Sequence, residues 1–201
     1  SLDLASERTA ITNFTGGLQG YNNEVTIKLN GNNFATTLGK DAQIRNISFI
    51  GNVNAQGFLA NENKGTITNV TIDVNGIEAS TLSFEGEAFV GGLVGINSGT
   101  IDGGKVLGLS ITGQSIVGGI AGRNTGAIKN SMVEFYNLYA GLDGENKVYQ
   151  SNTFTGENVG AIVGEIGANS SISYTYAYDY NLTNTSKVLN GSATNGAFAG
   201  K

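Results

Sequence analysis

The stretch GGLVGINSGTIDGG, residues 91–104, combines six glycines with a short row of apolar residues and an Asn-x-Gly turn. A second stretch, GGIAGRNTGAIKNS at residues 118–131, repeats the pattern Gly, Gly, two apolar residues, Gly, any residue, Asn, a small residue, Gly, a small residue and Ile. Internal similarity of this kind is typical of repeat architectures, in which each repeat stacks on its neighbours. The pair therefore predicts a stacked array and not a single glycine-rich loop that binds phosphate.

Three less regular copies extend the array. The sequence GFLANENKGTITNV at residues 57–70 reads as the same unit with one extra residue before its Asn-Lys-Gly turn. The copy GAIVGEIGANSSISY at residues 160–174 has a longer turn, and a fifth copy begins at Gly196. Because insertions in repeat proteins fall in loops, this uneven spacing predicts a fixed core of stacked strands with loops of variable length.

The strands of the unit change face once within a copy. In IRNISF, ITNVTIDV and IKNSMVEF an Asn stands two residues after an Ile, at Asn46, Asn69 and Asn130, and the apolar residues then continue on the opposite parity. Such a strand must turn a corner, and Asn tolerates the left-handed conformation that a corner needs. The Asn-x-Gly elements at 97–99 and 124–126 predict tight turns with Gly at positive φ. Together these features predict a β-solenoid of about six to eight coils, with Asn ladders along one corner.

The composition limits the possible functions. The 201 residues include no Pro, Cys or His, and 16 acidic against 11 basic residues give a net charge of −5. The charges are scattered and form no basic stripe, so a nucleic-acid partner is not expected. The longest apolar run, residues 88–96, is too short for insertion across a membrane. Without His or Cys, transition-metal sites and Ser-His-Asp or Cys-His catalysis are not expected, and no cofactor is predicted.

A family resemblance follows from these units. In NFTGGLQGYNNEVTIKLNG, residues 13–31, the order Phe-x-Gly, Gly, apolar strand and turn returns in a diverged form. From there to residue 201 the chain resembles the GLUG repeat family, whose Gly-Leu-x-Gly modules occur in bacterial surface proteins that include immunoglobulin-A-cleaving metalloproteases and large adhesins. The resemblance implies a right-handed single-stranded parallel β-helix in a secreted or wall-anchored bacterial protein, without a defined activity for the module. The sequence departs from the pattern at Ala60 and at the long turn over 165–170.

Three other kinds of site can be read from the residues. The Gly-Lys pairs at 39–40 and 104–105 lack the hydroxyl residue and the helix of a phosphate-binding loop. Glu85 and Glu87, two residues apart, would share a strand face at a separation suited to glycoside hydrolysis, although a solvated loop is the simpler interpretation of their segment. The Asp-Gly-Glu-Asn turn at 143–146, which begins at Asp143, offers oxygen ligands for calcium but lacks the spacing of calcium-binding loops.

The most distinctive segment outside the repeats is YTYAYDYN, residues 174–181. Strand alternation places four tyrosines on one side, and these are the candidate ligand-binding residues Tyr174, Tyr176, Tyr178 and Tyr180. If Tyr174 takes the corner position of the Asn residues, the tyrosines point outward and could stack on sugar rings or anchor a protein partner. If the longer turn shifts the register, the rings fill the core or lie under the segment 135–149.

We expect one all-β domain over residues 1–201, a solenoid with irregular loop insertions and a fragment of a larger chain. Diverged coils occupy 1–56 and GLUG-like repeats occupy 57–201. The expected function is that of a non-catalytic extracellular stalk or adhesion module at a bacterial cell surface, monomeric and with a host or environmental glycan or protein as its partner. The alternative is a polysaccharide-active β-helix enzyme, a glycosidase or lyase that uses surface carboxylates.

Overall fold

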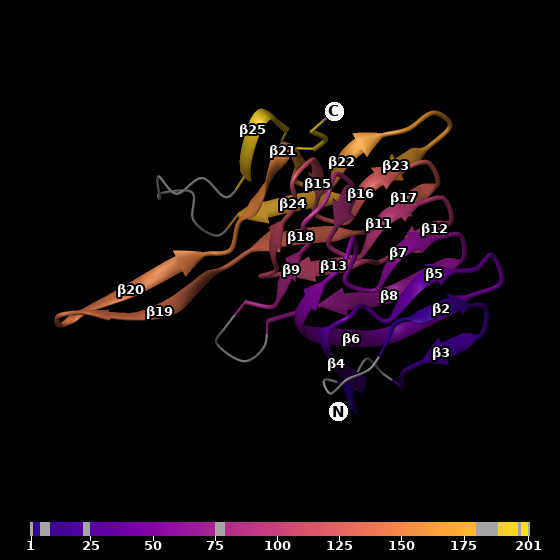
Figure 1. Ribbon diagram of the computed structural model, residues 1–201, viewed down its shortest axis with the longest axis horizontal. Coiled ribbons are helices and arrows are strands. Elements are labelled where there is room, and N and C mark those ends of the chain that lie inside the picture. The colour runs from indigo at the N-terminus through magenta and orange to yellow at the C-terminus, as the bar shows by residue number, and fades with distance from the viewer. Residues whose placement is uncertain are drawn as a thin grey trace.

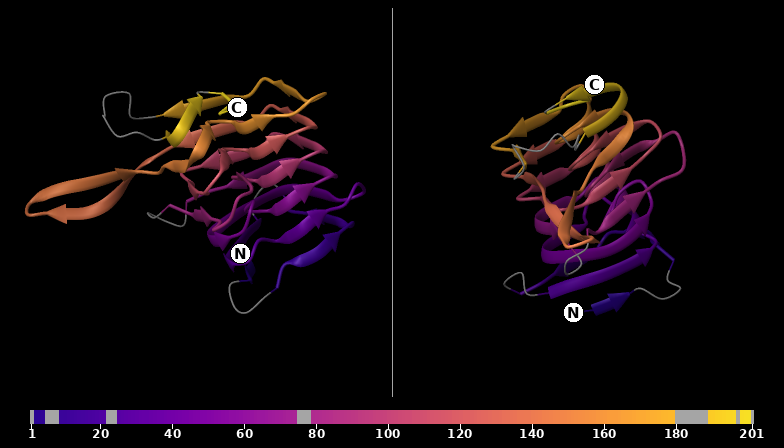
Figure 2. Two further views of the ribbon diagram at one scale, coloured as in Figure 1. Left: turned by 45° about the horizontal axis from the view of Figure 1, so that its top comes forward. Right: turned by 90° about the vertical axis from the view of Figure 1, so that its left-hand side faces the viewer.

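The fold is all-β. The structure is a computed structural model that describes residues 2–4, 9–21, 25–74, 79–179, 189–196 and 198–200. All regular elements of these residues are strands, and none of these residues lies in a helix that could cross a membrane. Successive strands follow one another along a single axis from the N-terminal to the C-terminal end of the molecule (Figures 1 and 2).

Six strands form one sheet, with a single strand from each successive repeat. Each strand pairs in parallel with the equivalent strand of the repeats before and after it. In order they are β2 (Ile11–Phe14), β5 (Ala35–Leu38), β7 (Ala60–Asn63), β11 (Val94–Asn97), β16 (Ala121–Asn124) and β22 (Val163–Ile166). This sheet carries the apolar-apolar-Gly part of the unit up to its Asn.

Seventeen strands form a second, larger sheet in which the other parts of the unit stack, again in parallel. Three rows can be distinguished by their pairing. The row that follows the Asn turn contains β3 (Gly17–Gln19), β6 (Gln43–Asn54), β8 (Thr66–Ile72), β12 (Thr100–Asp102), β17 (Ala127–Lys129) and β23 (Ser171–Ser173). Beyond the corner, the later parts of β6 and β8 continue beside β1 (Leu2–Leu4), β4 (Val25–Gly31), β13 (Lys105–Leu107), β18 (Met132–Phe135) and β24 (Tyr176–Asp179). The third row contains β9 (Thr81–Ser83), β10 (Phe89–Gly91), β14 (Ser110–Thr112), β15 (Ile116–Gly118), β21 (Phe154–Gly160) and β25 (Leu189–Gly196). Parallel strands in long sheets, stacked repeat on repeat, are consistent with a β-solenoid.

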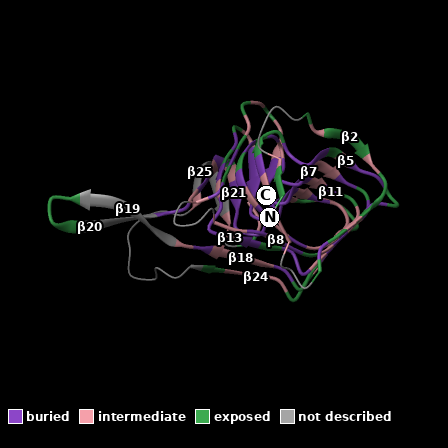
Figure 3. Ribbon diagram, turned by 90° about the horizontal axis from the view of Figure 1, so that it is seen from below, coloured by how far each residue is buried: buried purple, intermediate pink, exposed green. Residues whose placement is uncertain are grey.

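One insertion leaves this stack. Strands β19 (Asn137–Asp143) and β20 (Asn146–Ser151) form an antiparallel hairpin between β18 and β21. The hairpin projects from the body of stacked strands, as Figures 1 and 3 show. It is the largest of the variable loops that the uneven repeat spacing predicts.

The predicted repeat units lie over one another, with one correction to their alignment. Ile67, Ile101 and Ile128 are consecutive partners in the parallel sheet, as the sequence pattern requires. Gly57, however, pairs with Gly91 and not with Gly92, and the residues up to the turn then match one for one. The expected extra residue in the copy at 57–70 is therefore wrong. Phe58 stands where the later copy has its second glycine.

The corners have the predicted backbone conformation. Asn46, Asn69 and Asn130 have φ values of 54°, 50° and 51°. In the two other coils with the same corner, Gly103 has a φ of 73° and Tyr174 a φ of 49°. The left-handed region is costly for most residues and least so for Gly and Asn. The switch of apolar parity in the sequence thus marks a real corner.

The Asn-x-Gly turns require glycine for a different reason from the predicted positive φ. In the part of the chain that the structure describes, positive φ is found at five glycines, and neither Gly99 nor Gly126 is among them. A Cβ on Gly99 would lie 2.1 Å from the carbonyl oxygen of Gly65, and a Cβ on Gly126 would lie 2.2 Å from that of Gly99. These glycines are required because the coils stack so closely at the turn.

A ladder of asparagines lies inside the same turn. Asn63, Asn97 and Asn124 are fully buried. The Nδ2 of Asn63 donates to Oδ1 of Asn97 at 2.8 Å, and the Nδ2 of Asn97 donates to Oδ1 of Asn124 at 2.8 Å. Each of these amides would be costly to bury alone, and the ladder satisfies them in pairs. Ile166 takes the next position in the sheet and ends the ladder.

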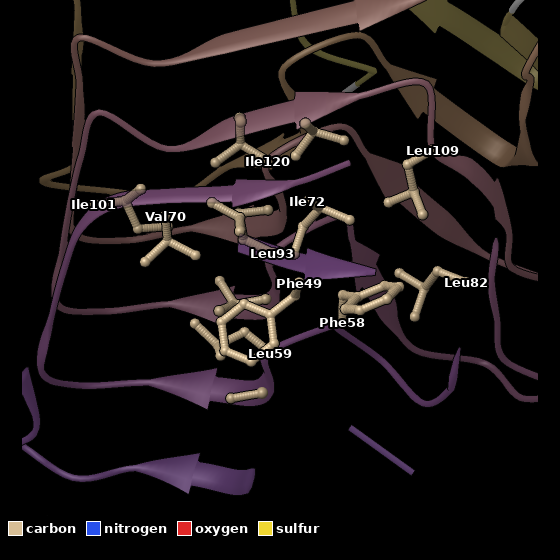
Figure 4. Close-up of a cluster of buried hydrophobic side chains, with 14 of the residues drawn as sticks. Phe49, Phe58, Leu59, Val70, Ile72, Leu82, Leu93, Ile101, Leu109 and Ile120 are labelled. Carbon is tan, nitrogen blue, oxygen red and sulfur yellow. The ribbon is translucent and has the colours of Figure 1, made fainter. Parts of the chain in front are cut away.

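Apolar side chains of all rows meet in one core between the sheets. Figure 4 shows part of it, where residues from different coils point toward one another. The buried residues labelled there are Phe49, Phe58, Leu59, Val70, Ile72, Leu82, Leu93, Ile101, Leu109 and Ile120. Because this core is continuous along the axis, each coil is stabilised by burying its apolar side chains against the coils before and after it.

Hydrogen bonds at the outer corner affect one carboxyl group. The Nδ2 of Asn130 donates to Oδ1 of Asp102 at 2.7 Å, and the Nζ of Lys129 lies 3.2 Å from Oδ2 of the same residue. The hydrogen bond from Asn130 is the largest cause of the lowered pKa of Asp102. The hydrogen bond and the charge of Lys129 lower this pKa further, while desolvation of the carboxyl group opposes the shift.

We expect the substitution Asn130→Gly to raise the pKa of Asp102 toward its ordinary value, because glycine keeps the left-handed corner and removes the amide donor. A folded-state pKa below the unfolded value adds stability above the unfolded pKa, and this contribution is lost as the pH falls through the folded-state pKa. An NMR titration of the side-chain carboxyl carbon measures the shift. An unchanged pKa in the variant would assign the effect to Lys129 instead.

Candidate functional site

The tyrosine segment forms the outer surface of the last described coil. Tyr176 and Tyr178 lie in β24, which pairs with β18 so that Tyr176 is the partner of Met132 and Tyr178 the partner of Glu134. Between the two tyrosines, Ala177 is the partner of the buried Val133 and packs against the core. Because neighbouring residues of a strand point to opposite sides, the two tyrosines point outward.

The exposure of the rings agrees with this direction. Tyr174, Tyr176 and Tyr178 are 85%, 57% and 45% exposed. Of the two arrangements that the sequence allows, the structure has the outward one for these three residues, with Tyr174 in the corner position. The fourth candidate, Tyr180, lies outside the described residues. Segment 135–149 does not bury the rings, because its hairpin projects from the body (Figure 3).

The neighbouring coil completes a small surface beside the two tyrosines. Met132 and Glu134 are half-buried on the outer side of β18, and Tyr136 follows directly after this strand. The hydroxyl of Tyr136 donates to Oε2 of Glu134 at 3.3 Å. We call these five residues, Met132, Glu134, Tyr136, Tyr176 and Tyr178, the tyrosine face.

A third coil lies next to the tyrosine face, because β13 pairs with β18. In β13, Lys105 is the partner of Met132 and Leu107 is the partner of Glu134. Tyr136 packs against Gly108, where a Cβ would lie 2.8 Å from the ring. Gly108 has a φ of 62°, so both its conformation and the contact with Tyr136 favour glycine there.

Sequence reasoning found the tyrosines but not the three residues beside them. The signal was present, because aligning the corner residue Tyr174 with Asn130 places Met132 beside Tyr176 and Glu134 beside Tyr178. Tyr136 could not be found in this way. It belongs to the start of the insertion, where the repeat no longer fixes the register.

The carboxylates considered for catalysis are separate from this face. Glu85 and Glu87 are exposed and lie in the irregular segment between β9 and β10, so they do not share the face of a strand. The solvated-loop interpretation holds for both residues.

The other sequence-based sites are also surface features. The turn at 143–146 lies at the tip of the hairpin, and the described residues contain no group of three acidic, His or Cys side chains that could hold a metal ion. Lys40 lies in a turn and Lys105 in a strand. The helix of a phosphate-binding loop follows neither lysine within the described ranges.

Large apolar side chains are exposed elsewhere only near the two ends of the stack, as far as the structure describes it. Besides the tyrosines of the last coil, these residues are Leu2, Ile11, Tyr21, Ile166 and Phe198. Tyr21 is 77% exposed and follows closely after β3, which lies at the opposite end of the axis from β24 (Figure 1). It offers a matched control for experiments on exposed tyrosines.

Comparison of the chain with protein-family models, with curated proteins and with solved structures gives no match.

Proposed function

We propose that the protein is a right-handed single-stranded parallel β-helix that acts as a non-catalytic stalk or adhesion module of a bacterial surface protein. Parallel pairing in every row of the two large sheets supports the β-helix. Right-handed crossover connections are the rule for parallel strands of one sheet, which supports the handedness. A closely stacked rod with a continuous core is stiff enough to hold a binding surface away from a cell.

The observation that carries the binding role is the outward row of tyrosines. The two preceding coils have other residues at the positions of the three exposed tyrosines. These residues are Asn130, Met132 and Glu134 in one coil and Gly103, Lys105 and Leu107 in the coil before it. Tyrosine offers a broad apolar ring with a polar tip at low entropic cost, and for that reason it is enriched in binding surfaces. The proposed ligand is a glycan or a protein outside the cell. The resemblance to GLUG repeats supports an extracellular bacterial location.

The double substitution Tyr176→Ala and Tyr178→Ala is expected to remove ligand binding without unfolding the protein, because both rings are largely outside the core. We expect a loss of at least tenfold in affinity, since two stacking contacts are removed. A glycan array and an array of extracellular matrix proteins measure binding, and circular dichroism checks the fold. Tyr21→Ala is the control and should bind as the wild type does.

If the wild type binds and the double variant retains full affinity, the tyrosines are not the binding surface. The exposed pair Glu85 and Glu87 permits a separate check of the non-catalytic assignment. New reducing ends released from a polysaccharide by the wild type but not by Glu85→Gln or Glu87→Gln would overturn it.

A further inference from the structure

We propose that the tyrosine face binds uncharged sugars and excludes acidic ones, with Glu134 as the residue that sets this specificity. The inference rests on the proposed binding role of Tyr176 and Tyr178 and narrows its ligand to one chemical class. It depends on the coil before the tyrosines, which contributes Met132, Glu134 and Tyr136 to the face.

The dimensions of the face suit a single sugar ring. Tyr176 and Tyr178 are two residues apart on one strand, which places their Cα atoms about 7 Å apart. Their partners Met132 and Glu134 lie on the neighbouring strand, about 4.8 Å away. The rings and the Met side chain offer apolar surface for the C–H groups of a pyranose, and the carboxylate lies at one corner of this surface.

Glu134 is prepared to accept hydrogen bonds from a ligand. Its Oε2 accepts a long hydrogen bond from the hydroxyl of Tyr136 at 3.3 Å. An ionised carboxylate accepts at both oxygens and donates at neither. Oε1 can therefore accept from sugar hydroxyl groups, and charge-assisted hydrogen bonds of this type are stronger than neutral ones.

The charge of the face opposes acidic ligands. Glu134 is the one acidic residue among the five and none of the others is basic, and the chain as a whole carries a formal net charge of −5. Lys105 lies one coil further down, opposite Met132, and Leu107 is the residue beside Glu134 in that coil. A sialic acid, uronic acid or sulfated sugar would thus bring a negative charge next to a carboxylate, and sites for such anions use Arg or Lys instead.

The size of the face favours a sugar over a folded protein. Specific protein interfaces bury about 800 Å² on each partner and involve about 20 to 30 residues a side. Within the described residues, the tyrosine face has five residues, and Tyr174 adds one exposed ring at the corner. Its neighbours on β13, Lys105 and Leu107, do not extend the aromatic surface. Stacking on one or two sugar rings needs no larger area.

The test compares matched pairs of oligosaccharides that differ only in a terminal sialic acid or a sulfate group. Isothermal titration calorimetry with the wild type is expected to show binding of the uncharged member and binding at least tenfold weaker of its acidic counterpart. Glu134→Gln keeps the size of the side chain and removes its charge. It should weaken binding of the uncharged oligosaccharide about tenfold and reduce the difference in affinity between the two members of the pair. Glu157→Gln removes an exposed carboxylate in β21 and should change neither affinity.

The outcomes separate this inference from the proposed binding role. If Tyr176→Ala with Tyr178→Ala removes binding but Glu134→Gln changes neither the affinity nor the preference, the tyrosines bind and the role of Glu134 is wrong. Equal or tighter binding of the acidic oligosaccharide, or binding of proteins alone, overturns the choice of uncharged sugars. Tyr136→Phe keeps the ring and removes the hydroxyl that donates to the carboxylate, so it should give a loss smaller than that of Glu134→Gln.

Discussion

Gly118→Ala is expected to destabilise the protein by about 3 kcal/mol or to prevent its folding, the upper range for overpacking in a close-packed structure. A Cβ on Gly118 would lie 2.1 Å from the carbonyl oxygen of Ala121 and 2.3 Å from the backbone nitrogen of Gly164 in the next coil. Backbone surrounds the added methyl group on both sides, and no flexible side chain can move away. The bend from Gly118 to Ala121 must open and the next coil must move away to admit it, which weakens the hydrogen bonds between the two coils.

Equivalent glycines of the other copies meet the same restriction. Gly91, Gly118, Gly160 and Gly196 are successive partners in the sheet, and Gly57 pairs with Gly91. For each of these positions, a Cβ would lie 2.2 Å or less from a carbonyl oxygen. In each case this oxygen belongs to the residue three positions later in the same coil, so the first glycine of the repeat is needed for the tight bend there. The phosphate-loop interpretation has no part in explaining it.

Gly17→Ala is the matched control for Gly118→Ala. Gly17 lies in β3, and a Cβ added there would meet no atom within 4 Å. We expect the control to change the free energy of unfolding by no more than about 0.5 kcal/mol. Urea denaturation followed by circular dichroism measures both variants. Equal stability of Gly118→Ala and Gly17→Ala would mean that the bend and the neighbouring coil can make room for a methyl group without cost, and the argument from close backbone contact would be wrong.

The sequence predicts the strand order and the corners because each has a local signal. The change of apolar parity at Asn46, Asn69 and Asn130 follows from which side of a strand is buried, so the pattern carries the geometry directly. Alignment of the copy at 57–70 failed because Phe58 replaces the second glycine of the pair. Its ring is buried in the core, so a large apolar residue takes this place without lengthening the unit.

Features outside the repeat are harder to predict. The hairpin of β19 and β20 pairs with itself and not with other coils, so no periodicity marks its strands. For the tyrosine segment, the alternation of residues gives two possible faces, and the longer turn at 165–170 hides which one is inward. The structure resolves this through the pairing of Ala177 with Val133. Glu134 becomes part of the candidate site only through this register.

Asn97→Ala is the second substitution for which we expect a large effect, a loss of about 3 kcal/mol in the free energy of unfolding. Asn97 is fully buried in the middle of the asparagine ladder. Its Oδ1 accepts from Asn63 at 2.8 Å, and its Nδ2 donates to Oδ1 of Asn124 at 2.8 Å. Alanine would remove both hydrogen bonds and leave a cavity, and each buried polar group that loses its partner adds about 1 to 3 kcal/mol.

Asn52→Ala provides the control on the surface. Asn52 is exposed, and its Oδ1 accepts from the hydroxyl of Thr81 at 2.8 Å. Water can replace this partner, so we expect a change within about 0.5 kcal/mol. If Asn97→Ala proves no more destabilising than Asn52→Ala, water or a side-chain shift must satisfy the ladder, and its hydrogen bonds contribute little.

Asn124→Ile separates the hydrogen bonds of the ladder from its packing. Ile166 already occupies the next position of the same row, so an isoleucine at 124 would end the ladder one coil earlier. The Nδ2 of Asn97 would still have the carbonyl oxygens of Ala127 at 3.2 Å and of Gly99 at 3.4 Å as acceptors. We therefore expect Asn124→Ile to cost less than Asn97→Ala in urea denaturation. Because Asn97 and Asn124 share one hydrogen bond, a double variant should lose less stability than the sum of the single variants, and strict additivity would show that the ladder does not act as a unit.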